Sequence, residues 1–140
     1  MKKSIIVLLL VAFVVAFAGT AAFAANAKFH IGIVTGTVSQ SEDDLRGAEL
    51  AIQKYGDVSK GGMIKHLTYP DNFMSEMETT IAQIAGLADD PKMKVIVVNQ
   101  AIPGTAEAFR RVKEKRPDIL CFAGEAHEDP DRKSTRLNSS

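Results

Sequence analysis

Four short apolar runs, separated by segments with helical periodicity, constrain the fold of this chain more than any other feature. Most of these runs are rich in β-branched residues, which is typical of strands, and they occupy residues 28–34, 63–68, 93–100 and 118–124. The run "MKVIVVNQ" (Met93 to Gln100) is almost continuously apolar, which indicates a strand buried on both faces of a parallel sheet. The order predicts an α/β fold with a parallel βαβαβαβ sheet and right-handed crossovers.

The segments between the runs repeat apolar residues at intervals of three and four, as one face of a helix does. The first helix is predicted over 41–55, with Ser41 at its start. The second is predicted from a cap at Asp71 or Asn72 as far as Ala88, and its methionines are expected to fill the core. The third follows "PGT" (residues 103–105) and is expected to end before Pro117.

The first 24 residues have the pattern of a secretory signal. Lys2 and Lys3 precede an apolar run, and small residues follow as far as Ala24. A transmembrane anchor is the alternative, but the run is shorter than the roughly 20 residues that a span needs. We therefore expect cleavage after Ala24, or after Ala27, and a secreted or periplasmic location. Contact with the membrane is expected only through this transient signal.

The last ten residues, "DRKSTRLNSS", have no apolar periodicity and do not continue the preceding pattern. Their back-translation matches a widely used sequencing adapter read in frame. We therefore expect residues 131–140 to be non-native, and residues 25–130 to be an incomplete N-terminal lobe. The alternative is a polar native tail without fixed structure.

Charge and cysteine content exclude some classes of protein. Lysine and arginine total 17, as do aspartate and glutamate, so the formal net charge is zero. Without a basic excess we expect no binding to nucleic acid. Cys121 is the single cysteine, so no internal disulfide can form. It lies in an apolar run, which indicates a small buried hydrophobic residue.

Polar residues and turn-forming residues follow every predicted strand. Ligands of open parallel sheets bind outside the carboxyl ends of the strands, so these loops are the candidate site. Hydroxyls, amides and backbone N–H groups orient a ligand without supplying chemistry, which favours binding a small polar molecule over catalysis. The candidate ligand-binding residues are Thr35, Gly36, Thr37, Ser39, Gln40, Tyr69, Asp71, Asn99, Gln100, Gly124 and Glu125. For Thr37 and Ser39, a role at the start of the first helix without ligand contact is an equal alternative.

Other kinds of site fit the sequence less well. Gly32 and Gly36 lack the spacing of a dinucleotide-binding motif, and no Walker lysine is present. The sequence has no G-x-S-x-G element of a hydrolase. A polar cluster that includes Glu125 and His127 could hold a metal, but it lacks the helical histidine pair of a zinc motif. We therefore predict no catalytic residue, no metal and no cofactor.

Two stretches resemble known proteins. "KFHIGIVTGTVSQSEDDLRGAELAIQKYG" is similar to the start of bacterial type I periplasmic substrate-binding proteins, and "DPKMKVIVVNQAIPGTAEAFRRVKEKRPDILCFAGEAHEDP" resembles later strands of the same lobe. Over residues 28–130 the chain resembles most closely an uncharacterised family of secreted bacterial proteins with that fold. Its neighbours are the basic-membrane-protein type nucleoside-binding lipoproteins and the sugar-binding proteins. Unlike those lipoproteins, this chain has no lipid-attachment cysteine.

The resemblance implies two α/β lobes with a ligand held between them. It also implies delivery of that ligand to an ABC permease or to a membrane receptor. The expected function is therefore extracytoplasmic binding of a small polar solute for uptake. The alternatives are a secreted sensor of the same fold, and an α/β enzyme whose catalytic residues lie in a part of the protein beyond this chain.

Overall fold

A computed structural model describes residues 27–125 of the chain. The predicted signal (residues 1–24), the predicted non-native tail (residues 131–140) and the candidate metal ligands after Glu125 lie outside these residues. Within the described part of the chain, no helix combines the length and the apolar character needed to cross a membrane.

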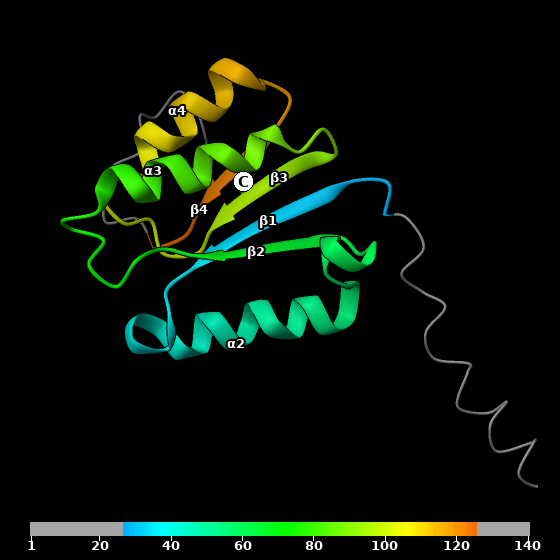
Figure 1. Ribbon diagram of the computed structural model, residues 1–140, viewed down its shortest axis with the longest axis horizontal. Coiled ribbons are helices and arrows are strands. Elements are labelled where there is room, and N and C mark those ends of the chain that lie inside the picture. The colour runs from blue at the N-terminus through cyan, green and yellow to red at the C-terminus, as the bar shows by residue number, and fades with distance from the viewer. Residues whose placement is uncertain (1–26, 126–140) are drawn as a thin grey trace, which may run out of the picture.

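The described residues form an α/β unit with one four-stranded sheet, in which every strand pair is parallel. Strands and helices alternate along the chain (Figure 1), so the predicted fold class is confirmed. The elements are β1 (His30–Thr35), α2 (Val38–Tyr55), η2 (Val58–Lys60), β2 (Ile64–Thr68), α3 (Met77–Gly86), η3 (Leu87–Asp89), β3 (Met93–Val98), α4 (Thr105–Lys115) and β4 (Leu120–Ala123).

The strand order in the sheet is β2-β1-β3-β4. From β1 the chain moves to one side to form β2, and then returns across β1 to form β3. Right-handed crossovers therefore place α2 on one face of the sheet, and α3 and α4 on the other (Figure 1). The direction of winding changes between β1 and β3, and this gap is where open α/β sheets bind ligands.

The core lies between the sheet and the pair α3 and α4. Alternate strand residues face it, among them Val34, Ile96 and Val98, each at most 1% exposed. Cys121 belongs to the same cluster and is 4% exposed. Burial raises the pKa of its thiol to about 11, so the prediction of a buried, small hydrophobic residue is confirmed.

One helix start matches the prediction apart from an extra turn, and the other differs: the main part of α2 follows Ser41, as predicted, whereas α3 starts later. α2 begins at Val38 and is broken at Ser41, whose extended backbone (φ −158°, ψ 89°) separates a single turn from the main helix. α3 begins only at Met77, because the backbone oxygen of Asn72 accepts bonds from Ser75 and Glu76 and closes a turn first. The expectation that the methionines fill the core is therefore wrong: Met74 is 68% exposed and Met77 is 38% exposed.

The two histidines of the strands are packed residues. His30 is 9% exposed, and its Nδ1 lies 2.6 Å from the Asp90 carboxylate at the amino end of the sheet. His66 is half-buried beside Thr35.

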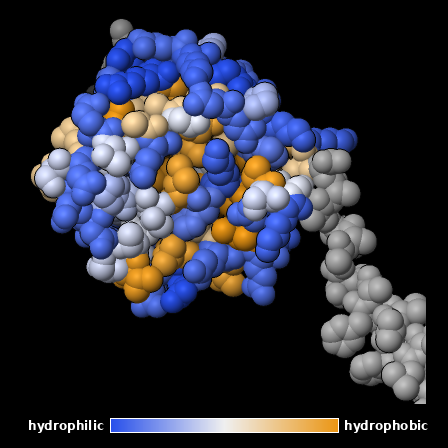
Figure 2. Space-filling model, viewed as in Figure 1, coloured by the Kyte–Doolittle hydropathy of each residue, from blue (hydrophilic) through white to orange (hydrophobic). Residues whose placement is uncertain are grey.

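On the outside of the molecule, hydrophobic surface along α2 and over the strands interrupts an otherwise hydrophilic face (Figure 2). Leu50 of α2 is 64% exposed.

Candidate functional site

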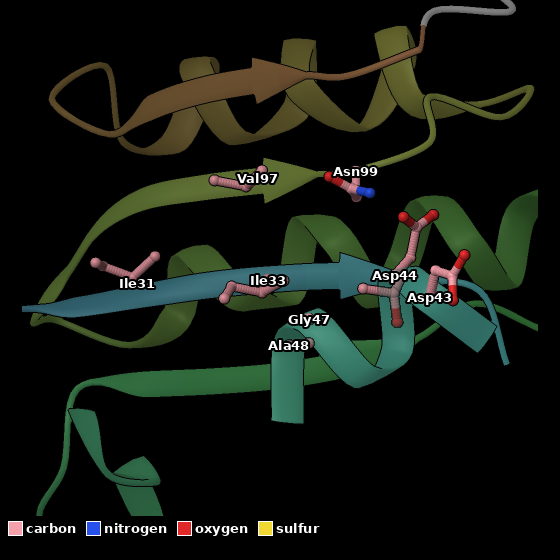
Figure 3. Close-up of a pocket in the computed structure, with 9 residues that line it drawn as sticks. Ile31, Ile33, Asp43, Asp44, Gly47, Ala48, Val97 and Asn99 are labelled. Carbon is pink, nitrogen blue, oxygen red and sulfur yellow. The ribbon is translucent and has the colours of Figure 1, made fainter. Parts of the chain in front are cut away.

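A cavity of about 290 Å³ lies between α2 and the sheet, at the gap between β1 and β3 (Figure 3). It therefore occupies the position that the change in winding direction predicts for a ligand. Its lining residues are Ile31, Ile33, Thr35, Asp43, Asp44, Gly47, Ala48, Val97 and Asn99.

The cavity has an apolar floor and a polar end, and its strand residues share one face because successive side chains alternate between the two faces of a sheet. Ile31 and Ile33 of β1, with Val97 of β3, form the floor on the α2 side of the sheet. At the carboxyl ends of the same strands the lining changes to Thr35 and Asn99. Figure 3 shows the Asp43 and Asp44 side chains, from α2, at this same polar end.

The Thr35 hydroxyl is fixed by two contacts. It donates to the backbone oxygen of Gly36 over 2.9 Å and lies 2.9 Å from Nε2 of His66. Since this hydroxyl has one proton and gives it to Gly36, the His66 ring is the donor in the second contact. Burial lowers the pKa of His66, which favours the neutral ring near neutral pH. Thr35 is thus held at the cavity wall in one orientation.

A second group of polar side chains, which we term the loop cluster, comprises Thr37, Ser39, Gln40 and Asp71. The Thr37 hydroxyl contacts the Asp71 carboxylate and lies 2.8 Å from the Ser39 hydroxyl. The Gln40 amide donates to the backbone oxygen of Asp71 over 3.1 Å. The loop cluster therefore joins the loops after β1 and β2, and three of its four members were candidates from the first of these loops.

The Asp71 carboxylate gives the loop cluster a measurable signature. Hydrogen bonds from Thr37 and then Ser39 lower its pKa, because they stabilise the ionised form. We expect Thr37→Val to move the pKa of Asp71 back toward the usual aspartate value, followed by NMR titration of the carboxyl carbon. Ser59→Ala, at the equivalent contact with Asp57, serves as a control that leaves Asp71 unchanged. An unaltered Asp71 titration in Thr37→Val would contradict the arrangement.

Tyr69 and Gly36 lie beneath the loops. Tyr69 is 1% exposed, and its hydroxyl donates to the side-chain oxygen of Gln100 over 2.9 Å. Its ring packs edge-on against Phe73, with ring centres 5.7 Å apart. A Cβ on Gly36 would lie 2.9 Å from the Tyr69 hydroxyl, so only glycine fits there without displacement. In this structure Tyr69 therefore supports the loops from below, and its predicted ligand contact stays a prediction.

Gly124 and Glu125 follow β4 at the same edge. The Gly124 N–H donates to Val98 over 2.9 Å, and its carbonyl accepts from Ala101 over 3.0 Å. A Cβ on Gly124 would overlap the backbone oxygen of Asn99. Glu125 is exposed and has a positive φ of 34°. Gly124 thus allows the end of β4 to pack closely against the backbone of Asn99, whose side chain lines the cavity.

The eleven candidates therefore occupy three neighbouring places. Thr35 and Asn99 line the cavity, four others form the loop cluster, and the remainder support or flank the loops. Asp43 and Asp44 were not among the predicted site residues, because acidic residues near a helix start also interact favourably with the helix dipole. Among the residues described here, no group of three or more histidine, cysteine, aspartate or glutamate side chains is placed to hold a metal ion.

The chain is similar to proteins of known sequence and structure. It is 44% identical over 105 residues to an "Uncharacterized protein" of Treponema pallidum (strain Nichols), a match that covers 74% of this chain and 48% of the relative. A second match from the same organism, also an "Uncharacterized protein", is 59% identical over 39 residues, which is 28% of this chain and 18% of the relative. The chain thus spans at most about half the length of these relatives.

A solved structure shares the fold. It is described as that of "a Putative transcriptional regulator from Clostridium difficile 630", with 32% identity and a TM-score of 0.61. The match covers 72% of this chain and 31% of that chain. A family model also matches, over residues 29–138. Because this match spans most of the chain, the protein belongs to the family described as "Protein of unknown function (DUF3798)".

Proposed function

We propose that the protein binds a small polar solute at the carboxyl edge of its sheet, without catalysing a reaction on it. The observation that carries this proposal is the cavity between β1 and β3, with an apolar floor and a polar end. Small-molecule sites combine mostly apolar walls with a few oriented polar groups. Here Thr35 and Asn99 supply a hydroxyl and an amide, and Asp43 and Asp44 supply carboxylates that accept hydrogen bonds.

We further propose that binding takes place outside the cytoplasm and serves uptake through an ABC-type permease. The signal-like pattern of residues 1–24 supports export. The winding of the sheet supports a lobe whose carboxyl edge faces a second lobe across the ligand, as the resemblance to substrate-binding proteins implies. A second lobe has to come from the part of the full-length protein that this chain does not contain.

Sensing is a second candidate function, and one observation favours it. The Clostridium difficile protein with the same fold is described as a regulator, and it is 32% identical to this chain. In a sensor, the same bound solute changes an interaction with a protein partner instead of supplying a permease. A permease gene beside the gene for this protein would favour uptake, and a gene for a membrane receptor would favour sensing.

The experiment that tests binding compares two glycines. Gly47 lines the cavity and Gly86 lies in α3, and a Cβ on either has no atom within 4 Å. We expect a compound from a panel of monosaccharides, nucleosides and amino acids to raise the melting temperature of the full-length protein. A ligand at a concentration of one hundred times its Kd raises the free energy of unfolding by about 2.7 kcal/mol. Gly47→Leu is expected to abolish this rise, because its side chain enters the cavity, whereas Gly86→Leu keeps it.

Two outcomes count against the proposal. Equal shifts in both glycine variants place the bound compound away from this cavity. Conversion of the compound by the wild-type protein, detected by mass spectrometry after incubation, would support an enzyme and contradict binding without catalysis.

A further inference from the structure

Half of one sheet face is apolar and uncovered in the described part of the chain. The residues of β3 and β4 that point away from α3 and α4 are Val95, Val97, Leu120 and Phe122. Leu120 is 55% exposed and the other three are half-buried. Their neighbours on the opposite face, Ile96 and Cys121, are buried. A parallel sheet with apolar residues on both faces is normally covered on both.

The uncovered area has the width of one helix. Neighbouring strands lie about 4.8 Å apart, and a helix with its side chains is about 10 Å across, so one helix covers about two strands. On one face, α3 and α4 together cover the sheet. On the other face, α2 packs on β1 and β2 (Figure 1). The α2 face therefore has room for one more helix, over β3 and β4.

The side of α2 that borders this area is suited to close packing. Gly47 and Ala48 both line the cavity between α2 and the sheet. A Cβ on Gly47 would meet no other atom within 4 Å. Small residues allow a neighbouring helix to approach closely, so a helix over β3 and β4 can lie beside α2.

The handedness of the crossovers excludes a helix that directly follows β4 in the chain. A further strand beside β4, reached by a right-handed crossover, would place its helix on the same face as α4. The described N-terminal end leaves the sheet on the far side from β4, since the Ala27 N–H donates to Gly61, just before β2. The remaining candidate is a segment that comes back to the sheet from outside the described residues. The Treponema pallidum relative has room for one, because this chain covers 48% of it.

We infer that the apolar face formed by Val95, Val97, Leu120 and Phe122 binds an amphipathic helix from a part of the full-length protein that this chain does not contain. The inference does not depend on solute binding. The inferred helix would also close one side of the cavity, because it borders the cavity beside Gly47.

Cysteine labelling tests this inference directly. In the full-length protein with Cys121→Ala, a maleimide is applied to Leu120→Cys and, as a matched control, to Leu50→Cys on the outer side of α2. Both leucines are exposed in the described structure, at 55% and 64%. We expect the cysteine at position 120 to react at least about tenfold more slowly, because a packed helix must open before the reagent enters. Equal rates at the two positions overturn the inference.

Two other occupants are separated by the same measurement. If protection of position 120 is lost on dilution together with a dimer seen by light scattering, a second copy covers the face. If protection is lost when residues 1–26 are deleted, the N-terminal segment covers it. Either result overturns the inference. Carbene footprinting of the wild-type full-length protein, which needs no variant, is expected to modify Leu50 and spare Leu120.

Discussion

Replacing Gly124 by alanine is expected to lower the free energy of unfolding by about 1–3 kcal/mol, the usual cost of forcing an added group into a packed site. The new Cβ would overlap the backbone oxygen of Asn99, so either β4 or the loop after β3 has to move. Because Asn99 lines the cavity, the same variant is expected to weaken solute binding. Chemical denaturation of the full-length protein, followed by circular dichroism, measures the first effect.

Gly86→Ala is the matched control for Gly124→Ala. Gly86 lies in α3 with helical backbone angles (φ −64°, ψ −20°), and an added Cβ meets no other atom. It is expected to stabilise the protein by about 0.5–1 kcal/mol, the usual gain over glycine within a helix. If Gly124→Ala is as stable as Gly86→Ala, the close approach of β4 to Asn99 is wrong.

The second large effect is expected at Ile96, in the middle of β3. Its side chain is 0% exposed and belongs to the core between the sheet and the helices α3 and α4. Ile96→Ala is expected to cost about 2–5 kcal/mol, because it removes buried methyl groups and leaves a cavity that close packing cannot fill. Thermal and urea denaturation of the full-length protein measure the loss.

Leu50→Ala is the control for Ile96→Ala. Leu50 is 64% exposed on α2, and surface substitutions of this kind stay within about 0.5 kcal/mol. Similar losses at both positions would show that the core does not lie on the α3 and α4 side of the sheet.

Much of the fold could be predicted from the sequence, because strands and helices differ in their hydrophobic period. Pro117 limited the third helix, as found. The run around Ile96 was predicted to be a strand buried on both faces; β3 does lie between two strands, but its Val95 and Val97 are only half-buried among the described residues. The extra turn of α2 before Ser41 and the late start of α3 could not be predicted. They depend on the backbone at Ser41 and on a turn closed by the Asn72 carbonyl, and neither changes the apolar pattern.

The candidate site was predictable in its position but not in its composition. The rule for strand ends selected Thr35 and Asn99, which line the cavity. It also selected Tyr69, which follows a strand yet turns beneath the loops, and this depends on its contacts with Gln100 and Phe73. Asp44 reaches the cavity from a helix, so its place depends on how α2 packs on the sheet.

NMR mapping of the bound solute tests the central claim most directly. The compound that stabilises the full-length protein is titrated into isotope-labelled protein, and the shifts of backbone amides and of the Asn99 side-chain amide are followed. We expect the largest shifts at Thr35, Asp44 and Asn99, around the polar end of the cavity. Largest shifts at the opposite end of the sheet, near His30 and Asp90, would contradict a solute site between β1 and β3.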